Sequence, residues 1–319
     1  MNTTTAEEPE SFLAEVCWHY YVNEMTQQDV ARIMGVTRLR VNRALQLARA
    51  AGIVRIEIAS PFVARLELQA ELCRRLNLTE AVCALADPEE HDYHGPVGAA
   101  LALWLEKGLR EGQWRSIGLS WGQTLKTAIQ RLPRLSIEGL EIVSMIGGTS
   151  QGASFNAFGV ASAMADRLGA NYSLFSAPIF LSPGTDRETF LAEGAFQAHL
   201  ARLQKLDLAV LVAGDVTERS FLVSMGLPTG VTPRHLTDAG AVGDVLGHFL
   251  KPDGTEIDHP IGRSAIGMDL ESLMNVPNRI LAAAGAHKVD IIIAACRRGL
   301  AQTLVTDDVT ARLVLEKLG

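Results

Sequence analysis

From about residue 86 onward, short apolar segments alternate with longer segments that have the periodicity of amphipathic helices. The apolar segments do not alternate polar with apolar residues, so both of their faces must be buried. Strands of this kind, separated by helices, predict a doubly wound α/β fold in which helices cover both faces of a parallel sheet. The expected strands are 116–120, 141–147, 172–178, 208–214, 279–285 and 301–306.

Four of the loops that follow these strands are rich in glycine and hydroxyl residues, namely 120–124, 147–150, 213–215 and 285–288. Ligands of parallel α/β sheets bind at the carboxyl ends of the strands. Glycines let backbone amides approach an anion, hydroxyls add hydrogen bonds, and a lysine supplies positive charge. A single loop of this kind is equally well explained as a turn, but four together predict a pocket for a phosphate or polyhydroxylated ligand.

The N-terminal segment has the signals of three helices. A first helix is expected from Phe12, and Thr26 with Asp29 marks the start of a short second helix that ends at Gly35. Thr37 starts the third helix. Two short helices joined by a tight glycine turn and preceded by a supporting helix are typical of a helix-turn-helix domain.

Charge is distributed unevenly along the chain. The 29 Lys and Arg residues against 36 Asp and Glu residues give a net charge of −7, which argues against a protein that coats nucleic acid with its whole surface. Residues 30–56, however, contain six arginines and no acidic residue. An ordinary solvated helix usually interleaves charges of both signs, although a solvated arginine-rich face remains the alternative. This segment is therefore the expected site of contact with double-stranded DNA.

The third helix carries the expected base contacts on the face opposite its apolar stripe. Arginine can bridge guanine O6 and N7, asparagine can bridge adenine N6 and N7, and leucine can touch a thymine methyl group. Residues at the starts of the second and third helices are placed for phosphate oxygens. The predicted DNA-binding residues are Gln27, Gln28, Thr37, Arg38, Leu39, Arg40, Asn42 and Arg43.

The remaining segments complete the expected domain organisation. Val54, Ile56 and Ile58 alternate with polar residues and predict a wing-like strand. The 61–85 segment is helical in pattern, and linker, dimerisation helix and first helix of the body are all open. The expected divisions are a disordered tail at 1–10, a helix-turn-helix, winged-helix-like domain at 11–60, a linker or oligomerisation helix at 61–85, and an effector domain at 86–319.

Other patterns exclude several classes. The four cysteines are scattered, without metal-ligand or disulfide spacing, so we expect a reducing compartment, no metal and no cofactor. No apolar run is long enough to cross a bilayer and no export signal is present, so a cytoplasmic protein without a membrane partner is expected. His235 and Asp238 lie in a glycine- and aspartate-rich segment that is expected to be either a loop over the pocket mouth or a structural turn.

Four segments together resemble the SorC/DeoR-type sugar-binding transcriptional regulators, namely MTQQDVARIMGVTRLRVNRALQLARAAGIVRI, IGLSWGQTL, LTDAGAVGDVLGHFLKPDG and AAAGAHKVDIIIAACRRGLAQTLVTDDVTARLVL. They occur in the order typical of that family and cover most of residues 11–317. The resemblance implies a helix-turn-helix coupled to an effector domain like that of glucosamine-6-phosphate deaminase. It further implies a homotetramer or homodimer that binds operator DNA and regulates carbohydrate or polyol catabolic genes as repressor or activator, in response to a sugar, sugar alcohol or sugar phosphate.

The resemblance also implies ligand contacts, which join those expected from the loops. The predicted effector-binding residues are Ser120, Gly122, Thr124, Gly148, Thr149, Asp215, Asp244, Gly285 and Lys288. Many family members have a glycine where this chain has Ala284. The added methyl group is expected to narrow the approach of an anion, which leaves an unphosphorylated sugar or sugar alcohol open as the effector.

Two alternatives from other classes remain at this stage. A sugar-phosphate isomerase or deaminase on the same fold needs a general base, for which His235, Asp238 or Asp244 is available. Such an enzyme has no use for a helix-turn-helix, so we expect no catalytic residues. The second alternative is an N-terminal domain that binds protein, and it predicts none of the salt dependence that phosphate contacts produce.

Overall fold

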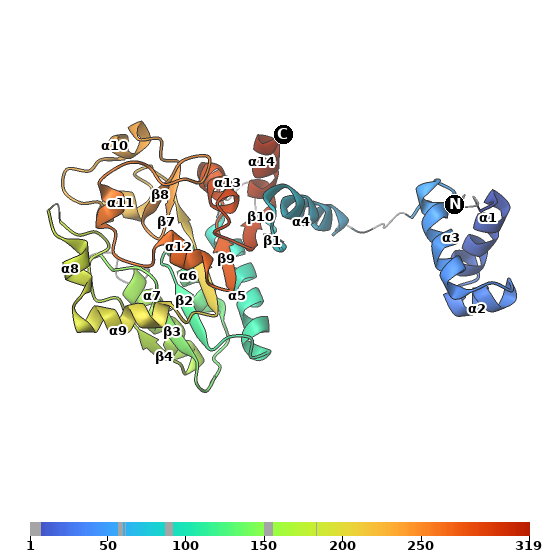
Figure 1. The fold of residues 1–319 in the computed structure, drawn as a ribbon, viewed down its shortest axis with the longest axis horizontal. Coiled ribbons are helices and arrows are strands. Elements are labelled where there is room, and N and C mark those ends of the chain that lie inside the picture. Colours follow the sequence, from blue (N-terminus) through green and yellow to red (C-terminus); the bar gives the residue numbers. More distant parts are fainter. Residues whose placement is uncertain (1–7, 57–59, 61, 87–91, 150–155, 183) are drawn as a thin grey trace, which may run out of the picture. The chain divides into compact units, whose positions relative to one another are not determined.

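The computed structural model describes residues 8–56, 60, 62–86, 92–149, 156–182 and 184–319. The chain forms two compact units, Met1–Val63 and Ala64–Gly319 (Figure 1). Each unit has its own hydrophobic core. None of the described helices is long and apolar enough to span a membrane.

The first unit is entirely helical over its described residues. Its elements are α1 (Glu10–Cys17), the π-helical turn η1 (Trp18–Val22), α2 (Gln27–Ile33) and α3 (Arg38–Ala50). The predicted N-caps are confirmed, because the Thr26 and Thr37 hydroxyls accept hydrogen bonds from the backbone N–H groups of Asp29 and Arg40, both at 3.2 Å. Gly35, with φ of 65°, makes the turn between α2 and α3. Val16, Val30 and Val41 are fully buried between the helices.

The predicted wing-like strand is wrong over the residues that the structure describes. Residues 54–56 form no strand, because the N–H groups of Ile53 and Val54 both donate to the Ala48 carbonyl and close the end of α3. Ile53 and Val54 pack against the helical core instead. The rest of the predicted strand, 57–58, and most of the predicted tail, 1–7, lie outside the described residues. Glu10 belongs to α1 rather than to the tail.

The second unit contains a seven-stranded, fully parallel sheet in the order β1-β10-β9-β5-β2-β3-β4. This confirms the predicted α/β fold, and each expected strand segment overlaps an observed strand. The strands are β1 (Glu80–Ala84), β2 (Ser116–Leu119), β3 (Glu141–Ser144), β4 (Asn171–Ser173), β5 (Leu208–Leu211), β9 (Asn278–Ala282) and β10 (Thr303–Asp307). The edge strand β1 was not predicted.

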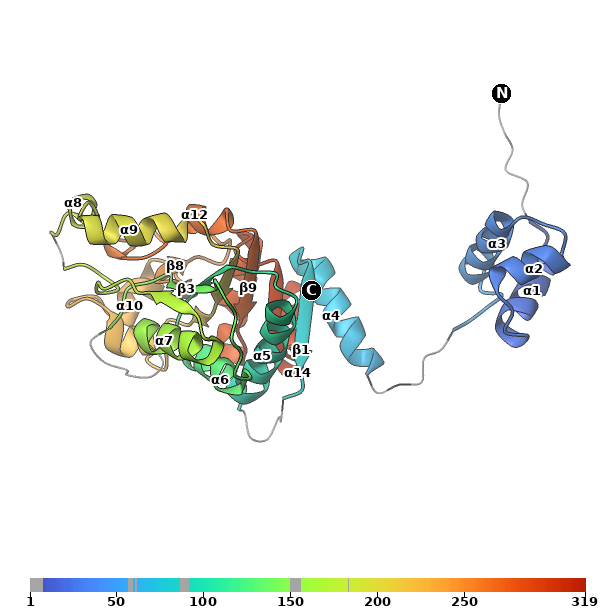
Figure 2. The same cartoon turned by 90° about the horizontal axis from the view of Figure 1, so that it is seen from below.

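Helices cover both faces of this sheet (Figure 2). Along β9, Ile280 and Ala282 enter one core while Leu281 enters the other, as a strand buried on both faces requires. One face is covered by α5 (His94–Arg110), α6 (Gln123–Arg131) and α7 (Ala157–Leu168). The other is covered by α4 (Val63–Leu76), α9 (Gly194–Leu203), α12 (Leu270–Met274), α13 (Val289–Arg297) and α14 (Asp308–Leu318).

A small antiparallel sheet, β6-β7-β8, lies beyond the end of β5. Its strands are β6 (Ala213–Gly214), β7 (Gly243–Val245) and β8 (His248–Leu250), and short helices α8 (Arg187–Leu191), α10 (Pro233–Asp238) and α11 (Ile261–Ser264) complete the unit. The β7–β8 turn consists of Leu246 and Gly247, both with positive φ, as a tight two-residue hairpin requires. The segment expected to be either a loop over the pocket mouth or a structural turn is therefore a helix followed by a hairpin.

Helix α4 belongs to the body rather than to a free linker. Its Leu68, Leu72 and Leu76 are buried in the same core as α13 and α14, whereas Leu66 is 58% exposed. The predicted boundary at residue 86 is consequently too late, because both α4 and β1 precede it and pack within the second unit.

We expect Leu72→Ala to destabilise the protein by about 2–5 kcal/mol, because the substitution leaves a cavity in a packed core. Leu66→Ala, on the exposed side of the same helix, is expected to change stability by less than about 0.5 kcal/mol. Urea denaturation of the full-length variants measures both values. Equal stability of the two variants would contradict the packing of α4 on the body.

Candidate functional site

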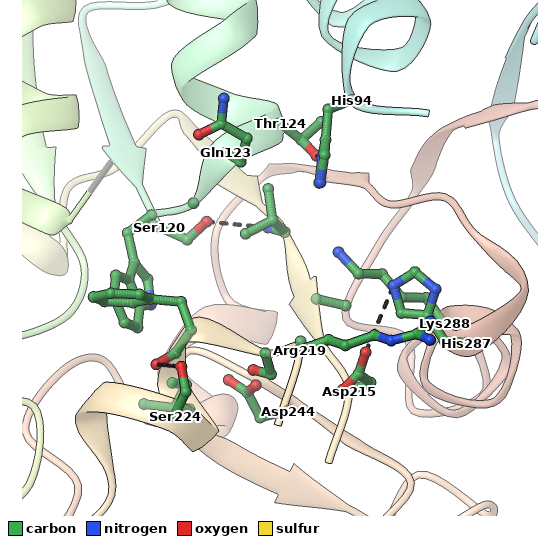
Figure 3. A pocket seen from close by; sticks show the side chains of 18 of the residues that line it. His94, Ser120, Gln123, Thr124, Asp215, Arg219, Ser224, Asp244, His287 and Lys288 are labelled. Atoms are coloured by element: carbon green, nitrogen blue, oxygen red, sulfur yellow. Dashed lines mark hydrogen bonds and ion pairs between the residues drawn. The ribbon is translucent and has the colours of Figure 1, made fainter. Parts of the chain in front are cut away.

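A pocket of about 340 Å³ lies at the carboxyl ends of β2, β5 and β9, which are neighbours in the sheet. Figure 3 shows His94 and Thr124 on one side of it, and Asp215 and Asp244 on the other. This volume is typical of a site for a small molecule. The position is the one that parallel α/β topology predicts for a ligand.

The loop between β2 and α6 forms one wall of the pocket. The Ser120 hydroxyl accepts a hydrogen bond from the backbone N–H of Val212 at 3.0 Å, which ties the end of β2 to the end of β5. Gly122, with φ of 133°, takes a conformation that other residues rarely adopt and starts α6. Thr124, the second residue of α6, is hydrogen-bonded to Nδ1 of His94 at 2.8 Å.

Asp215, just after β6, lines the opposite wall of the pocket. One carboxylate oxygen accepts hydrogen bonds from the backbone N–H and the hydroxyl of Thr217, both at 2.7 Å. The other oxygen lies 3.5 Å from Nε2 of His287, and the Tyr93 hydroxyl lies 3.3 Å from the same nitrogen. Burial lowers the pKa of His287, and the positive charge of Lys288 lowers it further.

Asp244 lies in β7, opposite Gly214 of β6. A Cβ atom at position 214 would come within 2.3 Å of Oδ1 of Asp244, so glycine is required there for the carboxylate to keep its position. Oδ2 accepts a hydrogen bond from the backbone N–H of Gly247 at 3.0 Å. Burial nevertheless raises the pKa of the Asp244 carboxyl to about 6.

Lys288 precedes α13 and supplies positive charge from the β9 side of the pocket. Its ammonium group makes no hydrogen bond and no ion pair within 4 Å in the part of the chain that the structure describes. Burial lowers its pKa, although Asp215 and Asp244 raise it at longer range. Burial, followed by the charge of Lys288, lowers the pKa of His94 to about 4, so this imidazole is neutral at pH 7.

The structure brings together six of the nine predicted effector-binding residues, namely Ser120, Gly122, Thr124, Asp215, Asp244 and Lys288. Gly148, Thr149 and Gly285 do not belong to the lining. Gly148 bonds to the 177–179 backbone and lies against the Phe158 ring, where a Cβ atom would clash. Thr149 lies near Gly226, and the end of its predicted loop, Ser150, lies outside the described residues. Gly285 donates its N–H to the Thr310 hydroxyl at 2.7 Å and starts the 3-10 turn η4 (Ala286–Lys288).

Several lining residues were not predicted from the sequence. Tyr93 and His94 lie at the start of α5, which follows the unpredicted strand β1. Arg219 contributes a second cation. Trp121 and Phe221 form an aromatic wall with an edge-to-face contact and 5.1 Å between ring centroids. Trp121 lies inside the SWGQTL segment, so that motif was the available signal for this wall.

The expected effect of Ala284 is wrong. Its side chain is 2% exposed and packs with Ile280, Ala282 and Val305 in the core between the sheet and α5, α6 and α7. The methyl group therefore does not narrow the approach of an anion to Lys288. Ala284 therefore gives no reason to doubt a phosphorylated ligand.

The two candidate catalytic residues outside this pocket have other contacts. Nδ1 of His235 accepts the backbone N–H of Thr232 at 3.3 Å, and the Thr232 hydroxyl accepts the N–H of His235, which together form a capping box at the start of α10. The Asp238 side chain is 69% exposed and lies 3.7 Å from Arg234. Neither His235 nor Asp238 lines the pocket.

On the first unit, five of the predicted DNA-binding residues are exposed on α3, namely Arg38, Leu39, Arg40, Asn42 and Arg43. Gln27, which is half-buried, and Gln28, which is exposed, lie at the start of α2 and share a hollow with Arg38. Thr37 acts as the N-cap of α3. Arg40 differs from its neighbours, because its guanidinium group is paired with Glu8.

Residues 60–316 match the family model described as "Putative sugar-binding domain". The chain is 30% identical over 312 residues to transcriptional regulator LsrR of Escherichia coli strain SMS-3-5, with 96% of this chain and 95% of that protein aligned. It is 26% identical over 310 residues to the erythritol catabolism regulatory protein EryD of Brucella abortus strain 2308, covering 97% and 98% of the two chains.

Solved structures share the fold. The full-length sorbitol operon regulator SorC from Klebsiella pneumoniae superposes with a TM-score of 0.71 at 24% identity, covering 96% of this chain and 98% of that chain. A DeoR family transcriptional regulator from Listeria monocytogenes gives a TM-score of 0.70 at 22% identity, over 79% of this chain and 99% of that chain.

The fold and the pocket define a ligand-binding α/β protein with a separate helical unit. The transcriptional regulator LsrR and the erythritol catabolism regulatory protein EryD both align with this chain over nearly their whole length. The chain belongs to the SorC-type family of sugar-binding transcriptional regulators, which confirms the resemblance seen in its motifs.

The raised pKa of Asp244 predicts a pH-dependent cost in stability. Between its ordinary value of 3.8 and about 6, the folded protein binds this proton more tightly than the unfolded chain does, so protonation stabilises the fold as pH falls through this range. We therefore expect Asp244→Asn to be more stable than the wild type at pH 7.5, by about 3 kcal/mol, since each pKa unit corresponds to about 1.4 kcal/mol.

The difference between the two proteins should shrink at pH 4.5, as measured by urea denaturation at both pH values. Asp238→Asn, at an exposed position, is the control and should show no such pH-dependent difference from the wild type. A variant that is less stable than the wild type at pH 7.5 would show that the bond from Gly247 outweighs the cost of burial.

Proposed function

We propose that the protein is a DNA-binding transcription factor for carbohydrate or polyol catabolic genes, and that a sugar, sugar alcohol or sugar phosphate bound in the second unit modulates its operator binding. The observation that carries the ligand assignment is the half-buried Lys288, whose ammonium has no hydrogen-bond or ion-pair partner among the described residues, in a pocket that also holds two carboxylates. Carboxylates accept hydrogen bonds from hydroxyl groups, and a cation without a partner favours an anionic one. A phosphorylated polyhydroxyl compound satisfies both.

We further propose that the first unit is a helix-turn-helix domain, α3 being its recognition helix. The capped starts of α2 and α3, the glycine turn and the exposed Arg38, Asn42 and Arg43 support this assignment. The second unit is then the effector domain, of the glucosamine-6-phosphate deaminase type. The working protein is a cytoplasmic homodimer or homotetramer, since a symmetric assembly places two recognition helices on one operator.

The effector works by shifting a population. It changes DNA binding only if it binds the DNA-competent and DNA-incompetent states with different affinities, because equal affinity shifts nothing. The pocket is lined by residues at the starts of α5, α6 and α13. A ligand that contacts all three helix starts stabilises one arrangement of them, and through it one of the two DNA-binding states.

We infer that the pocket senses its ligand without transforming it. Of the three side chains that the sequence offered as a general base, only Asp244 lines the pocket, and it lies against the backbone of β6. His235 caps a helix and Asp238 is at the surface. The two relatives named above are regulators, which supports the same inference.

A thermal-shift panel of sugars, sugar alcohols and their phosphates tests the ligand. A specific compound at about 100 times its dissociation constant is expected to add about 2.7 kcal/mol of stability. We expect a phosphorylated compound to give the response, and Lys288→Met to abolish it. Lys205→Met, which removes an exposed lysine outside the pocket, is the control and should retain it.

Two results of this panel would count against the ligand assignment. A response to free polyols that persists in Lys288→Met would contradict the proposal that the ligand carries a phosphate group. No response to any member of a broad panel would contradict sugar binding.

The DNA assignment predicts that Asn42→Ala and Arg43→Ala each weaken specific binding by about 1–3 kcal/mol per lost bidentate contact. The operator is first obtained by selecting bound duplexes from a random library with the wild-type protein, and affinities are then measured by gel shift. Arg131→Ala, at an exposed position on the second unit, removes the same charge as Arg43→Ala and should leave sequence discrimination unchanged. Unaltered sequence preference in both α3 variants would contradict the recognition-helix assignment.

A further inference from the structure

The first unit contains an ion pair between the segment before α1 and the predicted recognition helix. Nε and Nη2 of Arg40 donate to the two carboxylate oxygens of Glu8, both at 2.9 Å. The guanidinium carbon of Arg40 also lies 4.5 Å from the centroid of the Phe12 ring. Arg40 is thus held between a carboxylate and an aromatic ring, in the bidentate geometry that fixes a guanidinium most firmly.

The fold places Glu8 at this position. Pro9 is the N-cap residue of α1, and its carbonyl accepts hydrogen bonds from the N–H groups of Phe12 and Leu13 at 3.0 and 3.1 Å. Leu13 is in turn buried against α3. The packing of α1 on α3 therefore fixes the position of Glu8. The Glu8 side chain is only 16% exposed, against 48% for Arg40.

The pair occupies the donors that DNA would use. An arginine recognises guanine O6 and N7, or a phosphate, through two parallel N–H donors, and Arg40 already gives two of its donors to Glu8. The hydrogen bond from Arg40 lowers the pKa of Glu8, and the charge of Arg43 contributes in the same direction. Glu8 thus stays ionised at neutral pH and offsets the positive charge of α3 where DNA is expected to bind.

We propose that Glu8 is an intramolecular competitor of DNA, which holds Arg40 away from the phosphates and so lowers the affinity of the first unit for duplex DNA of arbitrary sequence. This inference rests on the proposed DNA-binding function. The predicted DNA contact of Arg40 then requires that its bond to Glu8 is first broken. Non-specific binding is weakened most, because it depends on phosphate contacts alone.

The test compares Glu8→Gln with Glu10→Gln in the full-length protein. Glu10 is an exposed residue two positions along the chain, so both variants lose the same charge but only the first loses the pair. Binding to a labelled 30-base-pair duplex of random sequence is measured by fluorescence anisotropy between 50 and 200 mM salt. Melting temperatures of the two variants are expected to agree, since exposed ion pairs contribute little stability.

We expect Glu8→Gln to bind the duplex about three-fold more tightly or better at 50 mM salt, with a slope of log K against log salt steeper by about 0.9, the value for one additional phosphate contact. Glu10→Gln should keep the wild-type slope. In an Arg40→Ala background, Glu8→Gln should no longer change the slope, because the arginine for which Glu8 competes with DNA is absent.

The outcomes separate this inference from the function on which it rests. Equal slopes for Glu8→Gln and Glu10→Gln, or weaker binding by Glu8→Gln, would overturn the competition while leaving DNA binding intact. A steeper slope that persists in the Arg40→Ala background would also overturn it. If neither the wild type nor Glu8→Gln binds the duplex in a salt-dependent way, the DNA-binding function itself fails and this inference fails with it.

Discussion

Burial of the parallel sheet on both faces is the constraint on which the rest of the second unit depends. Helices fill both sides, so polar groups that must meet a ligand are restricted to the ends of the strands. The adjacent strands β2, β5 and β9 bring their loops to one place, and the bond from the Val212 N–H to the Ser120 hydroxyl joins two of them. The pocket is therefore a consequence of strand order as much as of the residues that line it.

The central strands were predictable because each is a local run of apolar residues with a helix after it. The strand β1 was not, because it lies at the sheet edge and buries only alternate side chains, and it directly follows a helix. The β7–β8 hairpin was also missed, since Leu246 takes a positive φ that is uncommon for a residue with a side chain. Features set by pairing with distant segments carry weak local signals.

The same distinction applies to the two sites. Loops directly after predicted strands supplied five pocket residues and the family resemblance supplied Asp244, whereas Tyr93 and His94 lie at the start of α5, after a strand that was not predicted. The arginine-rich segment at 30–56 is uniform in charge along the chain, but in space Asp29 pairs with Arg32 and Glu8 pairs with Arg40. Acidic residues outside the segment thus reduce the positive charge that α3 and its neighbours present.

Gly214 and Asp244 are linked by contact although they lie on different strands. A side chain at position 214 cannot coexist with the Asp244 carboxylate in its present position, because the two would overlap. Substitution at either position therefore has a different effect depending on the residue at the other. In relatives with the same hairpin, we expect these two positions to vary together, and a chain that has lost the carboxylate is free to lose the glycine as well.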